Sequence, residues 1–167
     1  MDDTLYEKLL AAGLKFVSYR PRSQRELTSF LQNKLVRWKT AGSVSVAKAI
    51  DRLRELGYVN DTNFARWWID QRIQFRQKGK RAITAELLEK GISREVIAEV
   101  FDGLEKSEDG FDELANARKI LQKKLAFWSK LPIIEQKKKM YTYLAQRGFS
   151  GETIRKLIDE TSKKSYN

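Results

Sequence analysis

Apolar residues recur at intervals of three and four positions through most of the chain, which is the spacing of one face of an α-helix. The alternation of apolar and polar residues that is typical of a β-strand is not sustained anywhere. We therefore predict an all-α protein without a sheet. Two of the clearest apolar stripes are Leu5-Leu9-Ala12-Phe16 and Phe64-Ala65-Trp68-Ile69.

The residues at the ends of these stripes indicate where helices begin and end. Ser23 and Glu26 form a capping box directly after Pro21. Gly57 can take the left-handed conformation that ends a helix, and Asn60-Asp61 can cap the helix that follows. Together these signals predict about nine helices, which cover approximately residues 3–19, 23–38, 45–56, 61–77, 80–90, 93–105, 109–128, 133–147 and 150–162.

Trp67 and Trp68 are neighbours in one predicted helix, so their side chains point about 100° apart. Trp68 lies on the apolar stripe and is predicted to be a core residue. Trp67 is predicted to be partly exposed. It can cover a neighbouring helical unit, stack on a base or pack against a partner.

The chain contains an internal repeat. Lys90-Gly91-Ile92-Ser93 recurs as Arg147-Gly148-Phe149-Ser150 at an offset of 57 residues, and the surrounding apolar positions align at the same offset. The first unit contains about five extra residues, and Leu35 stands where the other units have glycine, so we predict a longer helix or an enlarged loop there. A fixed period of this length indicates stacked helical units. We predict three tandem three-helix repeats, over residues 1–60, 61–107 and 108–167.

The composition supports helices and narrows the possible chemistry. Only 2 prolines and 9 glycines interrupt 167 residues. The absence of cysteine and histidine excludes disulfides, thiolate metal sites and cysteine nucleophiles, and it removes the usual general base. We predict no catalytic residues, no cofactor and no metal, and we expect the chain not to be an enzyme.

The net charge of +11 is unevenly distributed. Residues 1–60 hold 11 basic and 6 acidic residues, residues 61–110 hold 9 and 10, and residues 111–167 hold 13 and 6. This imbalance favours a polyanionic partner such as nucleic acid, and a solubilising surface is the alternative. The N-terminus has no apolar signal region and no apolar run approaches the ~20 residues of a membrane span, so we expect a soluble, cytoplasmic protein.

Four segments carry a family resemblance when they are taken together in order and register. They are residues 14–27, with Tyr19-Arg20-Pro21-Arg22-Ser23; 53–65, with Leu56-Gly57-Tyr58-Val59-Asn60-Asp61; 78–92, with Lys78-Gly79-Lys80-Arg81; and 143–150, with Arg147-Gly148-Phe149-Ser150. Each is weak alone, but together the four resemble the RecX family of bacterial recombination regulators over nearly the whole chain. Leu35 and the extra residues around Trp38 depart from the family pattern, at the end of the first unit.

The resemblance implies three three-helix repeats in an elongated, curved array. It implies a non-enzymatic regulator that binds along the groove of the RecA filament on DNA and inhibits it. It can also imply direct binding to single-stranded or double-stranded DNA. We expect a monomer that contacts no membrane. A stand-alone helical nucleic-acid-binding module is the alternative, and an enzyme acting on nucleic acid is a third, weaker hypothesis.

Basic residues near helix junctions are the candidate contacts, because lysine and arginine can reach phosphates or the acidic faces of a protein filament. Arg20 and Arg22 can instead pair with Glu26 as structural residues. A solvated charged face is the alternative for the others, above all for the lysine run Lys137-Lys138-Lys139. The candidates are Arg20, Arg22, Arg25, Arg37, Trp38, Lys39, Arg72, Arg76, Lys78, Lys80, Arg81, Lys137, Lys138 and Arg147.

Two patterns that could indicate catalysis fail on inspection. Gly79-Lys80-Arg81 is not a phosphate-binding loop, since Gln74 replaces its first glycine and Arg81 replaces the magnesium-binding hydroxyl. Carboxylate pairs such as Glu86 with Glu89 are interpreted as surface salt-bridge partners, because a metal-dependent nuclease needs a converging acidic cluster.

Overall fold

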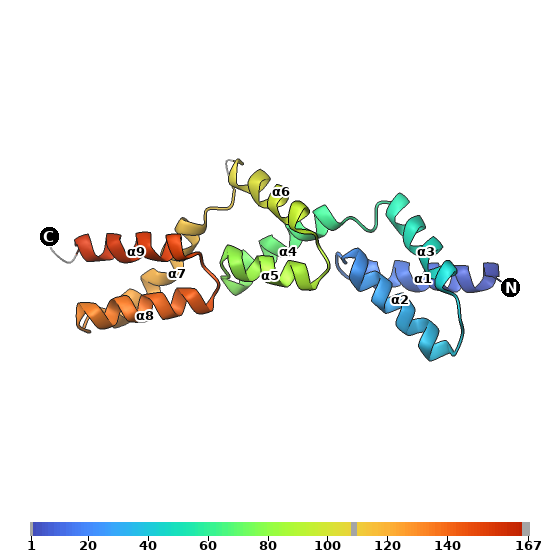
Figure 1. Ribbon diagram of the computed structural model, residues 1–167, viewed down its shortest axis with the longest axis horizontal. Coiled ribbons are helices and arrows are strands. Elements are labelled where there is room, and N and C mark those ends of the chain that lie inside the picture. Colours follow the sequence, from blue (N-terminus) through green and yellow to red (C-terminus); the bar gives the residue numbers. More distant parts are fainter. Residues whose placement is uncertain (1, 108–109, 165–167) are drawn as a thin grey trace. The chain divides into compact units, whose positions relative to one another are not determined.

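The computed structural model describes residues 2–107 and 110–164, and within these ranges the chain consists of nine helices and no strand (Figure 1). The predicted all-α class and every predicted helix are therefore confirmed. The helices are α1 (Asp2–Ser18), α2 (Gln24–Trp38), α3 (Ser43–Glu55), α4 (Asp61–Arg76), α5 (Lys80–Glu89), α6 (Arg94–Glu105), α7 (Glu113–Trp128), α8 (Ile133–Gln146) and α9 (Gly151–Lys164).

Several helices begin later than predicted because the first predicted residue is a cap. Ser23 accepts a hydrogen bond from the Glu26 N–H, and Glu26 accepts one from the Ser23 N–H, which completes the predicted capping box. Asp112 caps α7 by accepting a hydrogen bond from the Ala115 N–H. The predicted start of that helix at residue 109, and the predicted repeat boundary at 107/108, fall on residues 108 and 109, which lie outside the described ranges.

The described residues form two compact units, one of residues 2–67 and 87–100 and the other of residues 68–86, 101–107 and 110–164. In the first unit, α1, α2 and α3 contact one another. They enclose a hydrophobic core, since burial of apolar side chains is the main driving force for packing. Its fully buried members are Leu9, Leu27, Leu31, Ala49 and Leu53.

In the second unit, α7, α8 and α9 also contact one another, and their core includes Leu121, Met140, Leu144, Phe149 and Ile154. Met140, Leu144 and Phe149 belong to the repeated apolar positions, so the repeat in the sequence corresponds to core positions. The repeat boundaries themselves stay a prediction, because the compact units divide the chain in a different way.

The helix α4 buries the stripe that the sequence predicted. Phe64, Ala65 and Ile69 are almost completely buried and Trp68 is 8% exposed, whereas Trp67 is half-buried. The predicted core position of Trp68 and the partial exposure of Trp67 are therefore confirmed.

The extra residues of the first repeat lengthen a helix. α2 continues for seven residues beyond Leu31, whereas α5 and α8 continue for two residues beyond the equivalent Leu87 and Leu144. Leu35 is a buried residue inside α2 rather than a stop. Lys39, the C-cap residue that follows α2, takes the left-handed conformation with φ 52°, while Gly91 and Gly148 take it in the other repeats. Of the two predicted alternatives, the longer helix is confirmed.

Within the residues described, none of the helices has both the length and the apolar run that crossing a membrane requires.

Candidate nucleic-acid and protein interface

Arg20 and Arg22, at the corner between α1 and α2, are held by contacts inside the first unit. Arg20 donates to both carboxylate oxygens of Glu26, at 2.9 and 3.3 Å, and its guanidinium lies 5.6 Å from the ring centre of Trp67. Arg22 lies 3.9 Å from the ring centre of Phe16. The pairing with Glu26 agrees with the structural interpretation of Arg20, whereas Arg22 contacts Phe16 and not the predicted partner.

Glu26 connects this corner to a later helix. It also accepts a hydrogen bond from Lys90, at 2.9 Å, in addition to those from Arg20 and the Ser23 N–H. Desolvation raises the pKa of Glu26, but the hydrogen bonds from Arg20 and Lys90 outweigh it, so the net pKa lies below the ordinary value. Arg25 is exposed, and its aliphatic portion lies against Gly91.

The N-terminus of α2 also donates two hydrogen bonds within the first unit, one to a backbone carbonyl and one to a carboxylate. The Ser23 hydroxyl donates to the Lys90 carbonyl at 2.8 Å, and the Gln24 N–H donates to Asp61 at 2.8 Å. The helix end thereby satisfies donors and acceptors that have no partner within a helix. We call these contacts the first joint.

The candidates at the C-terminal end of α2 are exposed. Trp38 is 42% exposed and lies between Arg37 and Lys39, both of which are also exposed. Val36 and Val44 are 75% and 67% exposed on the same corner. This end of the first unit combines cations with apolar side chains, which is a composition that suits contact with a partner.

The basic cluster at the corner of α4 and α5 divides into engaged and exposed residues. Glu86 accepts from the Trp68 indole N–H at 2.8 Å, from Arg72 at 2.5 Å and from the Lys78 ammonium. The Arg72 guanidinium also lies 3.8 Å from the ring centre of Trp68. Desolvation raises the pKa of Glu86, but the hydrogen bonds from Lys78, Arg72 and Trp68 outweigh this effect, so the net pKa lies below the ordinary value.

Of the other three members of this cluster, one forms an ion pair and two are exposed. Lys80 pairs with Glu105 at 2.6 Å, whereas Arg76 and Arg81 are exposed. Sequence reasoning interpreted Glu86 as a surface salt-bridge partner, but the structure gives it a central role in a partly buried cluster. No local spacing signals this, because its donors lie 8, 14 and 18 residues away.

The N-terminus of α5 forms a second joint, entirely within the second unit. The Gly79 N–H donates to the Arg147 carbonyl at 2.9 Å, and the Arg81 N–H donates to the Gly148 carbonyl at 3.0 Å. The Lys80 N–H donates to Glu113 at 2.8 Å. A Cβ atom at position 79 would lie 2.4 Å from the Phe149 backbone, so only glycine fits there.

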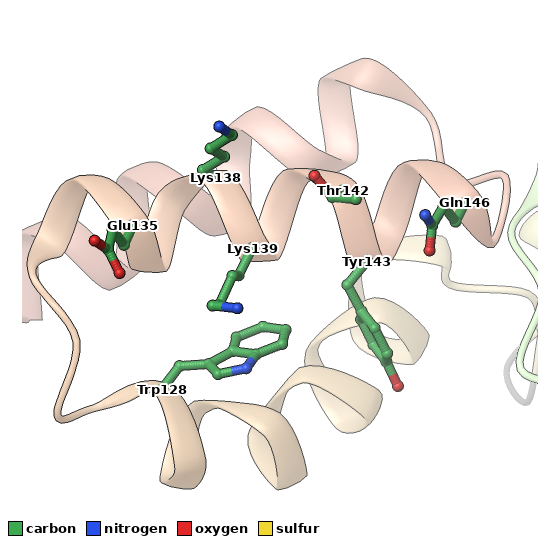
Figure 2. Close-up of a pocket in the computed structure, with 7 residues that line it drawn as sticks. All are labelled: Trp128, Glu135, Lys138, Lys139, Thr142, Tyr143 and Gln146. Atoms are coloured by element: carbon green, nitrogen blue, oxygen red, sulfur yellow. The ribbon is translucent and has the colours of Figure 1, made fainter.

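The lysine run of α8 borders a pocket of about 540 Å³ beside α7. Lys138 and Lys139 line it and are exposed, whereas Lys137 is half-buried. Figure 2 shows the Lys139 side chain extending from α8 toward the indole of Trp128. The full lining is Trp128, Glu135, Lys138, Lys139, Thr142, Tyr143 and Gln146.

Aromatic and basic groups are packed together at one wall of this pocket. The rings of Trp128 and Tyr143 meet edge to face, with centres 5.7 Å apart. The Arg147 guanidinium lies 4.0 Å from the centre of the Tyr143 ring, and the Lys124 ammonium lies 5.7 Å from it. The candidates selected from the sequence do not include Lys124, Trp128 or Tyr143.

The described part of the chain contains no cluster of three or more acidic, histidine or cysteine side chains that could hold a metal ion. The interface candidates described above are basic and aromatic side chains.

Comparisons with known proteins agree on one family. The chain matches the model of the second three-helix domain of RecX at residues 60–100 and that of the third at residues 112–158, which together make up more than half of the chain.

Individual relatives extend the match. The regulatory protein RecX of Chlorobium phaeobacteroides is 28% identical over 96% of this chain and 97% of its own length. That of Thermobifida fusca is 28% identical over 95% of this chain and 80% of its own length. That of Listeria innocua is 30% identical, and the chain spans 56% of its length.

The fold has solved counterparts. The crystal structure of RecX from Lactobacillus salivarius superposes with a TM-score of 0.80 at 22% identity, over 95% of this chain and 97% of that one. A second crystal structure of a regulatory protein RecX gives a TM-score of 0.73 at 21% identity, over 93% of this chain and 73% of that one. At these identities the two structures support the fold of three-helix repeats.

Proposed function

The chain belongs to the RecX family of regulatory proteins, and from that membership we propose that it regulates the RecA recombinase, mainly as an inhibitor. In this proposal it binds along the groove of the RecA–DNA filament and modulates ATP hydrolysis and strand exchange during recombination and DNA repair. The tandem match to two RecX domains is the observation that carries the proposal.

The repeats suit a polymeric partner. Proteins built from stacked helical repeats present extended surfaces, and a filament offers the same contact many times along its length. We assign the three repeats to residues 1–60, 61–107 and 108–167 and take the chain to act as a cytoplasmic monomer. It consumes no ATP of its own, so any change in hydrolysis arises in the recombinase.

The proposed contacts are the exposed basic candidates, since their charges are available to phosphates and to acidic protein surfaces. The engaged candidates support them by fixing the two corners; Arg72 and Lys78 do so through Glu86. The exposed candidates are Arg25, Arg37, Lys39, Arg76, Arg81 and Lys138, with Trp38 as an aromatic contact.

ATP hydrolysis by RecA on single-stranded DNA, titrated with less than stoichiometric amounts of the chain, tests the proposal. We expect a clear fall in the hydrolysis rate, and no hydrolysis by the chain alone. An unchanged rate, together with tight binding of the chain to DNA, would instead support the stand-alone nucleic-acid-binding module. The basic α8 surface is the observation that favours this second candidate.

A further inference from the structure

Positive charge is concentrated in one segment of the second unit. Residues 114–151 hold 9 lysines and arginines and a single acidic residue, Glu135. In residues 61–110, by contrast, 9 basic residues are balanced by 10 acidic ones. The segment contains nearly all of α7, the following turn and all of α8. We call it the α7–α8 hairpin, and it accounts for much of the net charge of +11.

The hairpin also displays aromatic and apolar side chains that the core does not use. Phe127 is 77% exposed, Ile134 is 78% exposed and Tyr141 is 56% exposed. A solubilising basic surface has no need of such groups, because exposed apolar area favours contact with a partner. Charge and aromatic surface therefore occur together on one element pair.

The pocket of about 540 Å³ lies on this hairpin, and its size falls within the range of ligand pockets, roughly 300–1,000 Å³. Arg147 and Lys124 lie close to the Tyr143 ring, so cations already occupy the surroundings of that ring. Trp128 remains the aromatic lining residue on which a planar group can stack. In Figure 2, Lys139 and the Trp128 indole lie on the same side of α8, whereas the Lys138 side chain extends from the other side of the helix.

We propose that this pocket is a stacking site for an unpaired nucleotide of single-stranded DNA, with the base on Trp128, the adjacent phosphate at Lys139 and a phosphate further along the strand at Lys138. Aromatic side chains combined with a basic surface are typical of sites for single-stranded nucleic acid. The proposal rests on the DNA contact in the proposed function and adds its location and strand preference.

Single-stranded DNA fits these groups better than two other polyanions. Duplex DNA keeps its bases stacked inside the helix and offers phosphates alone, so it does not use the aromatic wall. An acidic peptide pairs with lysines, but it has no repeated planar groups for Trp128. Glu135 lies at the pocket and repels phosphate, so it weakens binding of any polyanion at that end.

Fluorescence anisotropy of a labelled oligothymidylate, and of a blunt duplex of equal length, tests the proposal with the full chain and no recombinase. The first variant is Lys138→Gln/Lys139→Gln, which changes two exposed residues. We expect it to weaken oligothymidylate binding about tenfold and to reduce the dependence of affinity on salt, since each lost phosphate contact on a single strand lowers the slope by about 0.7.

The second variant, Trp128→Ala, removes the stacking surface, and we expect a loss of roughly tenfold for oligothymidylate and little change for the duplex. Circular dichroism reports whether this variant folds. If it does not, Trp128→Phe provides the same comparison with a smaller stacking loss. Glu135→Gln removes the only acidic residue of the segment, and we expect it to tighten binding about twofold.

Lys8→Gln/Lys15→Gln is the matched control, because it removes two exposed positive charges from α1 in the first unit. We expect less than a twofold effect. Equal losses in the control and in Lys138→Gln/Lys139→Gln would overturn the proposal, because the effect would then be net charge alone. Equal losses for oligothymidylate and duplex in the Trp128 variants would also overturn it.

The RecA hydrolysis assay separates this proposal from the proposed function. If the pocket variants Lys138→Gln/Lys139→Gln and Trp128→Ala bind oligothymidylate normally but no longer inhibit hydrolysis, the pocket holds a protein segment and the nucleotide site is rejected. If these variants lose oligothymidylate binding but still inhibit hydrolysis, the nucleotide site is supported, and inhibition does not depend on it. Inhibition absent in the unaltered chain would reject the proposed function, while its DNA binding would still report on the pocket.

Discussion

Glu86 is the shared acceptor for three donors at the corner of α4 and α5, and its side chain is only 20% exposed. Neutralising it in Glu86→Gln leaves two cations and an indole N–H without a charged acceptor. We expect the free energy of unfolding to fall by about 1–3 kcal/mol, as measured by urea denaturation. Glu89→Gln, which changes an exposed residue on the same helix, is the control and should have little effect.

The carboxylates of Glu26 and Glu86 also determine how stability depends on pH. Both have a folded-state pKa below the ordinary value of 4.5. A lowered pKa means that the stabilisation is complete above pH 4.5 and is lost as the pH falls through the folded-state pKa. Urea denaturation between pH 7 and pH 3 should therefore show a loss of stability confined to the acid range. Glu26→Gln/Glu86→Gln should be less stable at pH 7 and should show a shallower decline, and an equally steep one would contradict this.

The two joints are built alike, although they lie in different units. At the first joint, the α2 N-terminus meets the Lys90 carbonyl and Asp61; at the second, the α5 N-terminus meets the Arg147 carbonyl and Glu113. In each case the N-terminus of a helix donates hydrogen bonds to a backbone carbonyl just beyond the C-terminal end of a second helix. It also donates one to a carboxylate at the start of a third helix. This is a favourable arrangement, because the N-terminus of a helix carries partial positive charge and the C-terminus carries partial negative charge.

Gly79→Ala tests the second joint. The added methyl group would lie 2.4 Å from the Phe149 backbone, which cannot move away as a side-chain tip can. We expect the free energy of unfolding to drop by about 2 kcal/mol or more, as for overpacking against backbone. Gly151→Ala is the control, because a Cβ atom there meets nothing within 4 Å, and it should be neutral or slightly stabilising. Equal free energies of unfolding for the two variants would mean that the second joint accommodates the added methyl group without loss of stability.

The helices were predictable from sequence because their signals are local. The capping box at Ser23, the glycine stop at Gly91 and the apolar stripe around Phe64 each depend on residues within a few positions. The predicted end of α2 at residue 38 is confirmed, although Lys39, which follows it, takes a conformation that glycine usually takes and that the lysine side chain does not signal.

Whether a basic residue is paired or exposed was less predictable, because pairing depends on partners that are far away in the sequence. Lys90 binds Glu26 across 64 positions, and the spacing of charges contains no information about such a pair. The charge of the α7–α8 hairpin was visible in the sequence as nine basic residues against Glu135, but its pocket required the packing of Trp128 against Tyr143.

At the scale of the whole molecule, the basic residues divide into those that form ion pairs inside a unit and those that are exposed at its surface. Arg72 and Lys78 form ion pairs with Glu86, so reversing their charge would disturb folding as well as binding. Arg76 and Arg81 flank the same corner and are exposed. Arg76→Glu/Arg81→Glu therefore tests the interface with the least effect on the fold.

We expect Arg76→Glu/Arg81→Glu to retain its helical circular dichroism and thermal midpoint while it inhibits RecA hydrolysis roughly tenfold less well, since like-charge contacts with a polyanionic filament are repulsive. Inhibition should be measured at two salt concentrations, because added salt screens exposed charges and should narrow the difference between variant and unaltered chain. Lys8→Glu/Lys15→Glu makes the same change of net charge on α1 and is the control. Full inhibition by the Arg76 and Arg81 variant would remove this corner from the proposed interface. Equal weakening in the control would mean that the filament responds to the net charge of the chain rather than to these two residues.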